Sequence, residues 1–127
     1  MSHTGLPAFD KTVQESNAWL KLLMEHLGTD DREYAYRVMR AALHALRDRV
    51  GPGTALHLAA QLPMLIRGMY LEGWQPTATP TRERHLEEFF SHVAKALPQG
   101  LRGNPEQTMR AVFLVIWEKS IKVRSVS

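Results

Sequence analysis

Basic side chains recur along one side of a helix that the sequence predicts over about residues 30–50. Arg37, Arg40, His44 and Arg47 follow one another at intervals of three or four residues. At about 100° per residue, this spacing places them with Glu33 on one side of the helix, opposite its apolar side. A row of arginines could bind the phosphates of a nucleic acid or an acidic partner protein. The solvated outer face of an amphipathic helix has the same pattern, and we favour that simpler interpretation.

A second polar group lies in a short predicted helix that ends near Gly73. Arg67, Tyr70 and Trp74 are spaced so that they share one face of this helix. An arginine guanidinium can stack on an aromatic ring or bind an anion, and Gly68 would let a ligand or another helix come close. These residues form a candidate groove. The alternative is that they only pack the end of the helix against the rest of the fold.

The residue types needed for enzymatic or metal chemistry are poorly represented in the sequence. The six histidines include no pair spaced i, i+4 and no His-Glu-x-x-His motif. The absence of cysteine excludes disulfides, thiolate nucleophiles and cysteine-ligated metals. The sequence also has no Gly-x-Ser-x-Gly elbow, phosphate-binding loop or dinucleotide motif. We therefore predict no catalytic residue, no metal site and no cofactor.

Helices must position the residues above. Apolar residues at helical spacing, bounded by capping residues and by Gly or Pro, predict six helices. We expect Asp10, Asp30, Thr81 and Asn104 to be N-cap residues, and Gly28 to end the first helix. The chain should form one domain of 127 residues. Its expected parts are an N-terminal tail (1–8), a first hairpin (9–51), a short helix pair (52–74), a loop (75–80), a second hairpin (81–121) and a C-terminal tail (122–127).

The two hairpins resemble each other when the sequence is shifted by 70 positions. The tripeptide Met-Arg-Ala occurs at 39–41 and again at 109–111, and the apolar positions around it also correspond. Duplication of one helical hairpin explains this match. We therefore predict an all-α fold of about six helices, in which two pseudo-repeated hairpins flank two short central helices.

The predicted sixth helix contains the run Ala-Val-Phe-Leu-Val-Ile-Trp at 111–117, which is apolar on every side. A helix of this kind must be covered all round, either at the centre of the core or by a partner subunit. We favour central burial. The alternative is a homodimer formed through Phe113, Leu114 and Trp117.

Charge and hydropathy restrict the location and the partners of the protein. The net charge of +3 is smaller than is typical of a dedicated nucleic-acid binder. The N-terminal residues lack the basic and apolar regions of a secretory signal. The longest apolar run is the one at 111–117, whereas a membrane-spanning helix needs about 20 residues. We expect a cytoplasmic protein that does not enter a membrane.

Several segments resemble a bacterial family known as domain of unknown function 2267. They are GLPAFD (5–10), NAWL (17–20), AALHALRDR (41–49) and, most specifically, AQLPMLIRGMYLEGW (60–74). The resemblance extends from Gly5 through the sixth helix. It implies an all-helical fold and a bacterial, cytoplasmic setting, and it brings no activity, cofactor or catalytic residue.

Together, these patterns favour a non-enzymatic helical module that binds another protein or a second copy of itself. One alternative is weak, non-sequence-specific binding of nucleic acid through the basic helix face, although we do not expect nucleic acid as the partner. A second alternative is a small-ligand or metal site between the repeats.

Overall fold

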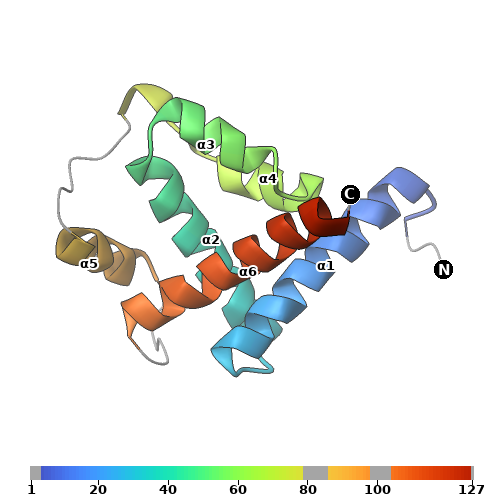
Figure 1. The fold of residues 1–127 in the computed structure, drawn as a ribbon, viewed down its shortest axis with the longest axis horizontal. Coiled ribbons are helices and arrows are strands. Elements are labelled where there is room, and N and C mark those ends of the chain that lie inside the picture. The colour runs from blue at the N-terminus through green and yellow to red at the C-terminus, as the bar shows by residue number, and fades with distance from the viewer. Residues whose placement is uncertain (1–3, 79–85, 98–103, 127) are drawn as a thin grey trace.

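The computed structural model describes residues 4–78, 86–97 and 104–126, and in these residues it contains six α-helices, one 3-10 helix and no strand. The all-α prediction is therefore confirmed (Figure 1). The elements are α1 (Pro7–Leu27), α2 (Arg32–Arg49), α3 (Pro52–Ala59), α4 (Met64–Leu71), η1 (Pro76–Ala78), α5 (Leu86–Ala96) and α6 (Pro105–Val126).

Helix α1 begins earlier than the sequence indicated. Pro7 occupies its first turn, where the fixed φ of proline suits a helix and its missing N–H is not needed. Asp10, the predicted N-cap, instead lies within the helix, and its Oδ1 accepts a hydrogen bond from the Thr4 hydroxyl at 2.7 Å. The predicted end is confirmed, because Gly28 adopts φ 70° at the C-cap. Residues 7 and 8, predicted to belong to the N-terminal tail, therefore lie in α1, which starts two residues before the predicted hairpin.

The start of α2 also differs by one residue from the prediction. Asp31 rather than Asp30 is the N-cap, and its Oδ1 accepts a hydrogen bond from the Tyr34 N–H at 3.0 Å. The Thr29 hydroxyl in turn accepts from the Asp31 N–H at 3.0 Å. The side chains of Thr29 and Asp31 therefore both stabilise the turn between α1 and α2.

At α6 the predicted cap is confirmed: Asn104 Oδ1 accepts from the Gln107 N–H at 2.7 Å. The helix continues to Val126 and does not end at residue 121 as predicted. Residues 122–126, predicted as a C-terminal tail, therefore belong to α6. The predicted loop at 75–80 contains η1. The predicted cap Thr81 lies outside the described residues.

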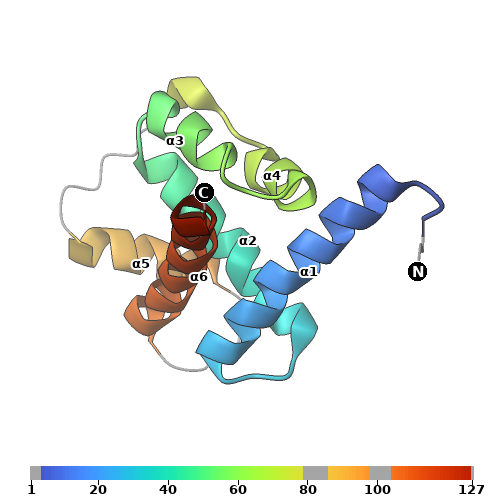
Figure 2. The ribbon, with the colours of Figure 1, turned by 45° about the vertical axis from the view of Figure 1, so that its right-hand side comes forward.

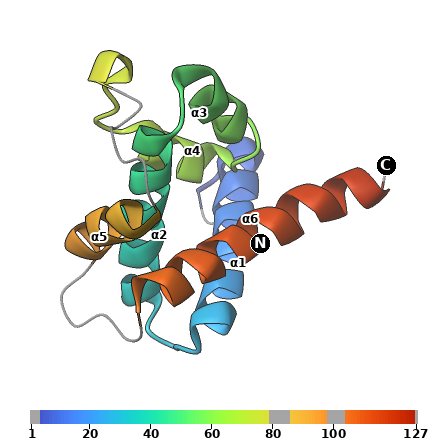
Figure 3. The same cartoon turned by 60° about the vertical axis from the view of Figure 1, so that its left-hand side comes forward.

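Helix α2 is the centre of the fold. Among the described α-helices, it packs against all the others, with α1 and α6 on one side and α3, α4 and α5 around the rest (Figures 1 and 2). Helix α6 packs against α1, α2 and α5, and Figure 3 shows its last turns projecting past α1. The expectation that α6 is central is therefore wrong. The buried apolar residues of α2 are Tyr34, Ala35, Val38, Met39, Ala42, Leu43 and Ala45.

The packing of the four long helices has the pairing that a repeated hairpin would produce. If α1 and α2 are exchanged with α5 and α6, the contact between α1 and α6 becomes the contact between α5 and α2, and both contacts are present. The duplication itself stays a prediction. Helix α4 packs against both α1 and α2, and α3 packs against α2 and α4. Of the described helices, none is long and apolar enough to cross a bilayer.

The position of the α2 cap can be tested with two neighbouring aspartates. We expect Asp31→Ala to lower the free energy of unfolding by about 1 kcal/mol, because it removes the acceptor for the Tyr34 N–H. Asp30→Ala is the matched control and should change it by less than about 0.5 kcal/mol. Urea denaturation followed by circular dichroism measures both values. Equal effects of the two substitutions would contradict the observed cap.

Candidate functional site

Three basic side chains of α2, those of Arg40, His44 and Arg47, contact the C-terminal end of α4. Arg47 is 5% exposed, and its Nη1 donates hydrogen bonds to the backbone carbonyls of Tyr70 and Glu72, each at 2.9 Å. Its Nε and Nη2 donate to the two carboxylate oxygens of Asp48 at 2.8 and 3.2 Å. The guanidinium therefore bridges its own helix and the end of α4 inside the fold.

The other two donors are placed one and two turns earlier on α2. His44 Nε2 donates to the Met69 carbonyl at 2.7 Å, and Arg40 Nη2 donates to Glu72 Oε1 at 2.9 Å. The C-terminal end of a helix presents unpaired carbonyls and a partial negative charge, which basic side chains stabilise. The last turn of α4 has no basic residue of its own. Helix α2 therefore supplies the donors for this helix end.

This arrangement corrects the predicted basic stripe. Arg37 and Arg40 are exposed, His44 is half-buried and Arg47 is buried, so the four side chains do not form one continuous solvent-exposed surface. The spacing on α2 is as predicted, but Arg40, His44 and Arg47 bind the end of α4 instead of forming an exposed surface. The sequence signal lay in α4 rather than in α2, because the last turn of α4 contains no Lys, Arg or His that could bind its carbonyls.

The environment of His44 favours its neutral form. Burial is the largest effect and lowers the pKa of His44 below the ordinary 6.5. The hydrogen bond to the Met69 carbonyl raises it, nearby Arg47 and Arg40 lower it, and Asp48 raises it, with a net lowering. Because the Met69 carbonyl can only accept, Nε2 carries the hydrogen in this contact.

The predicted groove of Arg67, Tyr70 and Trp74 is not formed. Tyr70 is fully buried, and its hydroxyl donates to the Ala55 carbonyl at 2.9 Å. Burial raises the pKa of Tyr70 to about 12, against the opposing effect of Arg47. Arg67 donates through Nε and Nη2 to two backbone carbonyls at the end of α3 and in the turn after it, those of Ala59 and Leu62, each at 2.9 Å. Arg67 and Tyr70 therefore hold α3 and α4 together.

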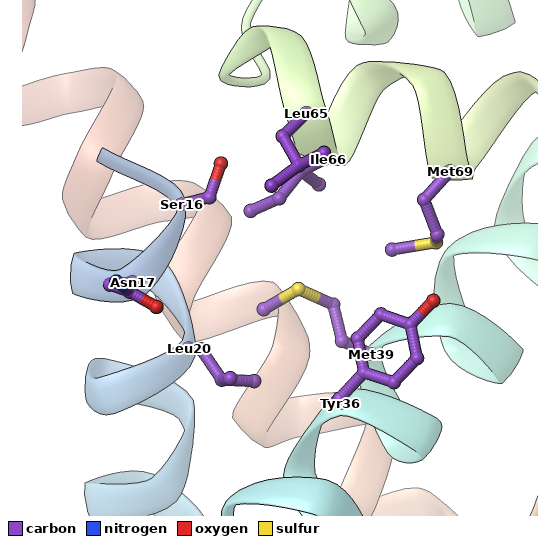
Figure 4. Close-up of a pocket in the computed structure, with 8 residues that line it drawn as sticks. All are labelled: Ser16, Asn17, Leu20, Tyr36, Met39, Leu65, Ile66 and Met69. Carbon is purple, nitrogen blue, oxygen red and sulfur yellow. The ribbon is translucent and has the colours of Figure 1, made fainter. Parts of the chain in front are cut away.

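A cavity of about 310 Å³ lies between α1, α2 and α4. Figure 4 shows side chains from the three helices arranged around a common space. Two of them are methionines, whose flexible thioether side chains adapt to different occupants. The volume falls at the small end of the range for small-molecule pockets, about 300–1,000 Å³. The lining residues are Ser16, Asn17, Leu20, Tyr36, Met39, Leu65, Ile66 and Met69.

Ser16 is the buried polar residue of this cavity. It is 8% exposed, and among the described residues its Oγ has no hydrogen-bond partner. Sequence analysis did not single it out, although a signal existed: Ser16 lies on the face of α1 marked by Val13 and Leu20, three residues before it and four after it. A serine on the apolar face of an amphipathic helix needs a hydrogen-bond partner when that face is buried.

The outer face of α6 is apolar and exposed. Trp117 is 63% exposed, Phe113 42% and Leu114 39%, whereas Val112 and Val115 on the inner face are buried. The predicted self-association residues therefore lie on the surface of the single chain, and the favoured alternative of complete central burial is wrong. The same face begins with an exposed ion pair between Glu106 and Arg110 at 3.6 Å.

Metal ligands do not gather in the described part of the chain. Within residues 4–78, 86–97 and 104–126, no three His, Cys, Asp or Glu side chains are close enough to share a metal ion.

Comparison with known families matches residues 16–121 to a family model. The chain belongs to the family known as domain of unknown function 2267. The family is described as an uncharacterised conserved protein, so the match shows family membership and assigns no activity. The resemblance inferred from the sequence is confirmed. No functionally curated protein matches the chain. In this member of domain of unknown function 2267, the matched region includes the cavity, the donors of α2 and the exposed face of α6.

The role of Arg47 predicts a large difference between two arginines of the same helix. We expect Arg47→Gln to lower the free energy of unfolding by about 2–4 kcal/mol, because it leaves the Tyr70 and Glu72 carbonyls and the Asp48 carboxylate without their donor. Arg37→Gln, on the exposed side, should change it by less than about 0.5 kcal/mol. Chemical denaturation of both variants measures the difference. Similar small losses would mean that Arg47 is solvated in solution.

The lowered pKa of His44 predicts a loss of stability on acidification. The unfolded chain binds a proton near pH 6.5, and the folded protein binds it only at a lower pH. The stability contributed by neutral His44 is therefore complete above pH 6.5 and is lost as the pH falls through this window to the folded pKa. His44→Gln retains a donor for the Met69 carbonyl and does not titrate. We expect the wild type to lose more stability than this variant between neutral and mildly acidic pH, measured as the difference in Tm. Parallel curves would contradict the prediction.

Proposed function

We propose that this protein is a non-enzymatic helical interaction module that binds through the outer face of α6, with a second copy of the same chain as its partner. The observation that carries the proposal is the exposure of Phe113, Leu114 and Trp117 on one face of one helix. Leu114 and Trp117 are three residues apart, and Phe113 and Trp117 are four apart, so the three side chains form a continuous apolar strip.

Such a strip is costly to leave in water and is typical of a binding surface. Contiguous apolar patches on single chains mark interaction sites more often than isolated apolar residues do. Tryptophan is enriched among the residues that contribute most to binding, and Trp117 is the most exposed member of the strip. A strip on a helix can pair with the same strip of a second copy across a two-fold axis, since such an interface uses one patch twice.

The nucleic-acid alternative has lost part of its structural support. It required Arg37, Arg40, His44 and Arg47 on one exposed face, but Arg47 is buried and Arg40 is paired with Glu72. The bacterial and cytoplasmic setting inferred from the resemblance stays a prediction.

The proposal predicts an association that depends on Trp117. Light scattering of the wild type from micromolar to millimolar concentration should show a monomer–dimer equilibrium. Trp117→Gln should weaken the dimer by about tenfold or more, because it removes the largest exposed ring of the strip.

Leu56→Gln is the matched control, since Leu56 is also a large apolar residue with more than half of its surface exposed, and it lies on α3. Its dissociation constant should equal that of the wild type. A monomer at all concentrations would refute the homodimer, and equal weakening by both variants would refute the assignment to α6.

A further inference from the structure

The cavity between α1, α2 and α4 is held open by hydrogen bonds between its walls. The Leu65 N–H at the start of α4 donates to Thr12 Oγ1 of α1 at 3.0 Å. The carbonyl of Met69 near the end of α4 accepts from His44 of α2 at 2.7 Å. Arg32 of α2 donates to Asn17 of α1. The three helices are thus tied to one another around the space, so the cavity does not require a ligand to order its walls.

We propose that this cavity binds a small, neutral, mainly apolar molecule whose single polar oxygen forms a hydrogen bond with the Ser16 hydroxyl. The proposal is independent of the α6 face. A volume of about 310 Å³ corresponds to about ten non-hydrogen atoms if each occupies roughly the 30 Å³ of a liquid water molecule. The ligand is therefore of the size of a monocyclic aromatic alcohol or a medium-chain alcohol or ketone.

The polarity of the ligand follows from Ser16. A buried hydroxyl without a partner is unfavourable, and a ligand with a hydrogen-bonding oxygen would remove this cost at Ser16. Figure 4 shows the Ser16 side chain leaving α1 on the side of α4, toward Leu65 and Ile66. A hydroxyl or carbonyl oxygen of the ligand satisfies the Ser16 Oγ, and its apolar part lies against Leu20, Met39 and Met69.

The neutrality of the ligand follows from the remaining walls. Of the residues that line the cavity, none carries a charged side chain. A carboxylate or an ammonium group placed at the inner end beside buried Ser16, away from exposed Leu65 and Tyr36, would lose its hydration without a counter-charge among the lining residues. A neutral molecule pays only for the desolvation of its one polar group, which the Ser16 hydroxyl offsets.

Two isosteric probes separate the contribution of shape from that of the hydrogen bond. Benzyl alcohol and ethylbenzene have the same number of non-hydrogen atoms and differ in one hydroxyl. We expect both to bind at millimolar concentration and to shift the NMR methyl signals of Met39 and Met69. Benzoate should bind more weakly than benzyl alcohol, because none of the lining residues carries a positive charge.

The Ser16→Ala variant then tests the polar contact. It should weaken the binding of benzyl alcohol by about fivefold, the usual effect of one neutral hydrogen bond, and should change that of ethylbenzene by less than about twofold. Ser91→Ala is the matched control, because Ser91 is an exposed serine on α5 outside the cavity. It should leave both affinities unchanged.

Several outcomes would overturn the proposal. One is the absence of shifts at Met39 and Met69 with either probe. Another is equal weakening of both probes by Ser16→Ala, which would show that the hydroxyl does not contact the ligand. A third concerns Leu20→Trp, which places a larger side chain in the cavity from α1. If this variant remains folded by circular dichroism and still binds the probes, they do not occupy the cavity. If this variant instead changes the oligomeric state while the wild type binds neither probe, the cavity accepts a side chain of a protein partner and not a small molecule.

Discussion

The C-terminal end of α4 is bound by Arg47 and His44 of α2, and this contact fixes where α4 lies in the fold. Arg47 and His44 of α2 bind the carbonyls of three of the residues from Met69 to Glu72. A buried guanidinium is tolerated only when its charge and its N–H groups are compensated. The Asp48 carboxylate and the α4 carbonyls provide this compensation, and they thereby fix α4 against the middle of α2.

The position of α4 in turn determines the cavity. Leu65, Ile66 and Met69 form its third wall, and both ends of that wall are tied by hydrogen bonds, to Thr12 at one end and to His44 at the other. Neighbouring helices in a closely packed core normally interdigitate and leave little space. Here the spacing between α1 and α4 is set partly by polar contacts rather than by apolar packing alone. A space bounded mainly by apolar side chains, with Ser16, Asn17 and Tyr36 as its polar members, remains between them.

The sequence predicted the existence of the six helices and two of the five caps, since Asn104 with Gln107 and Gly28 at a helix end are local patterns. It did not predict which helix is central. An amphipathic pattern shows which side of a helix is polar, but a polar side can be covered by the carbonyls of another helix end, as it is at Arg47. Conversely, the 111–117 run of α6 is apolar on all sides and still leaves Trp117 exposed. Central and peripheral positions depend on contacts between segments far apart in the chain, which periodicity does not encode.

The cavity was missed for the same reason, because its walls come from three separate helices. The two proposed surfaces nevertheless share a part of the core. Met39 lines the cavity and also lies beside Val112 and Val115, on the inner face of α6. The outer face of the same helix carries the exposed apolar strip. A change at Met39 would therefore alter the packing under both surfaces. Ser16 lines the cavity, and Trp117 lies on the exposed face of α6, so these two residues separate the small-molecule site from the protein interface.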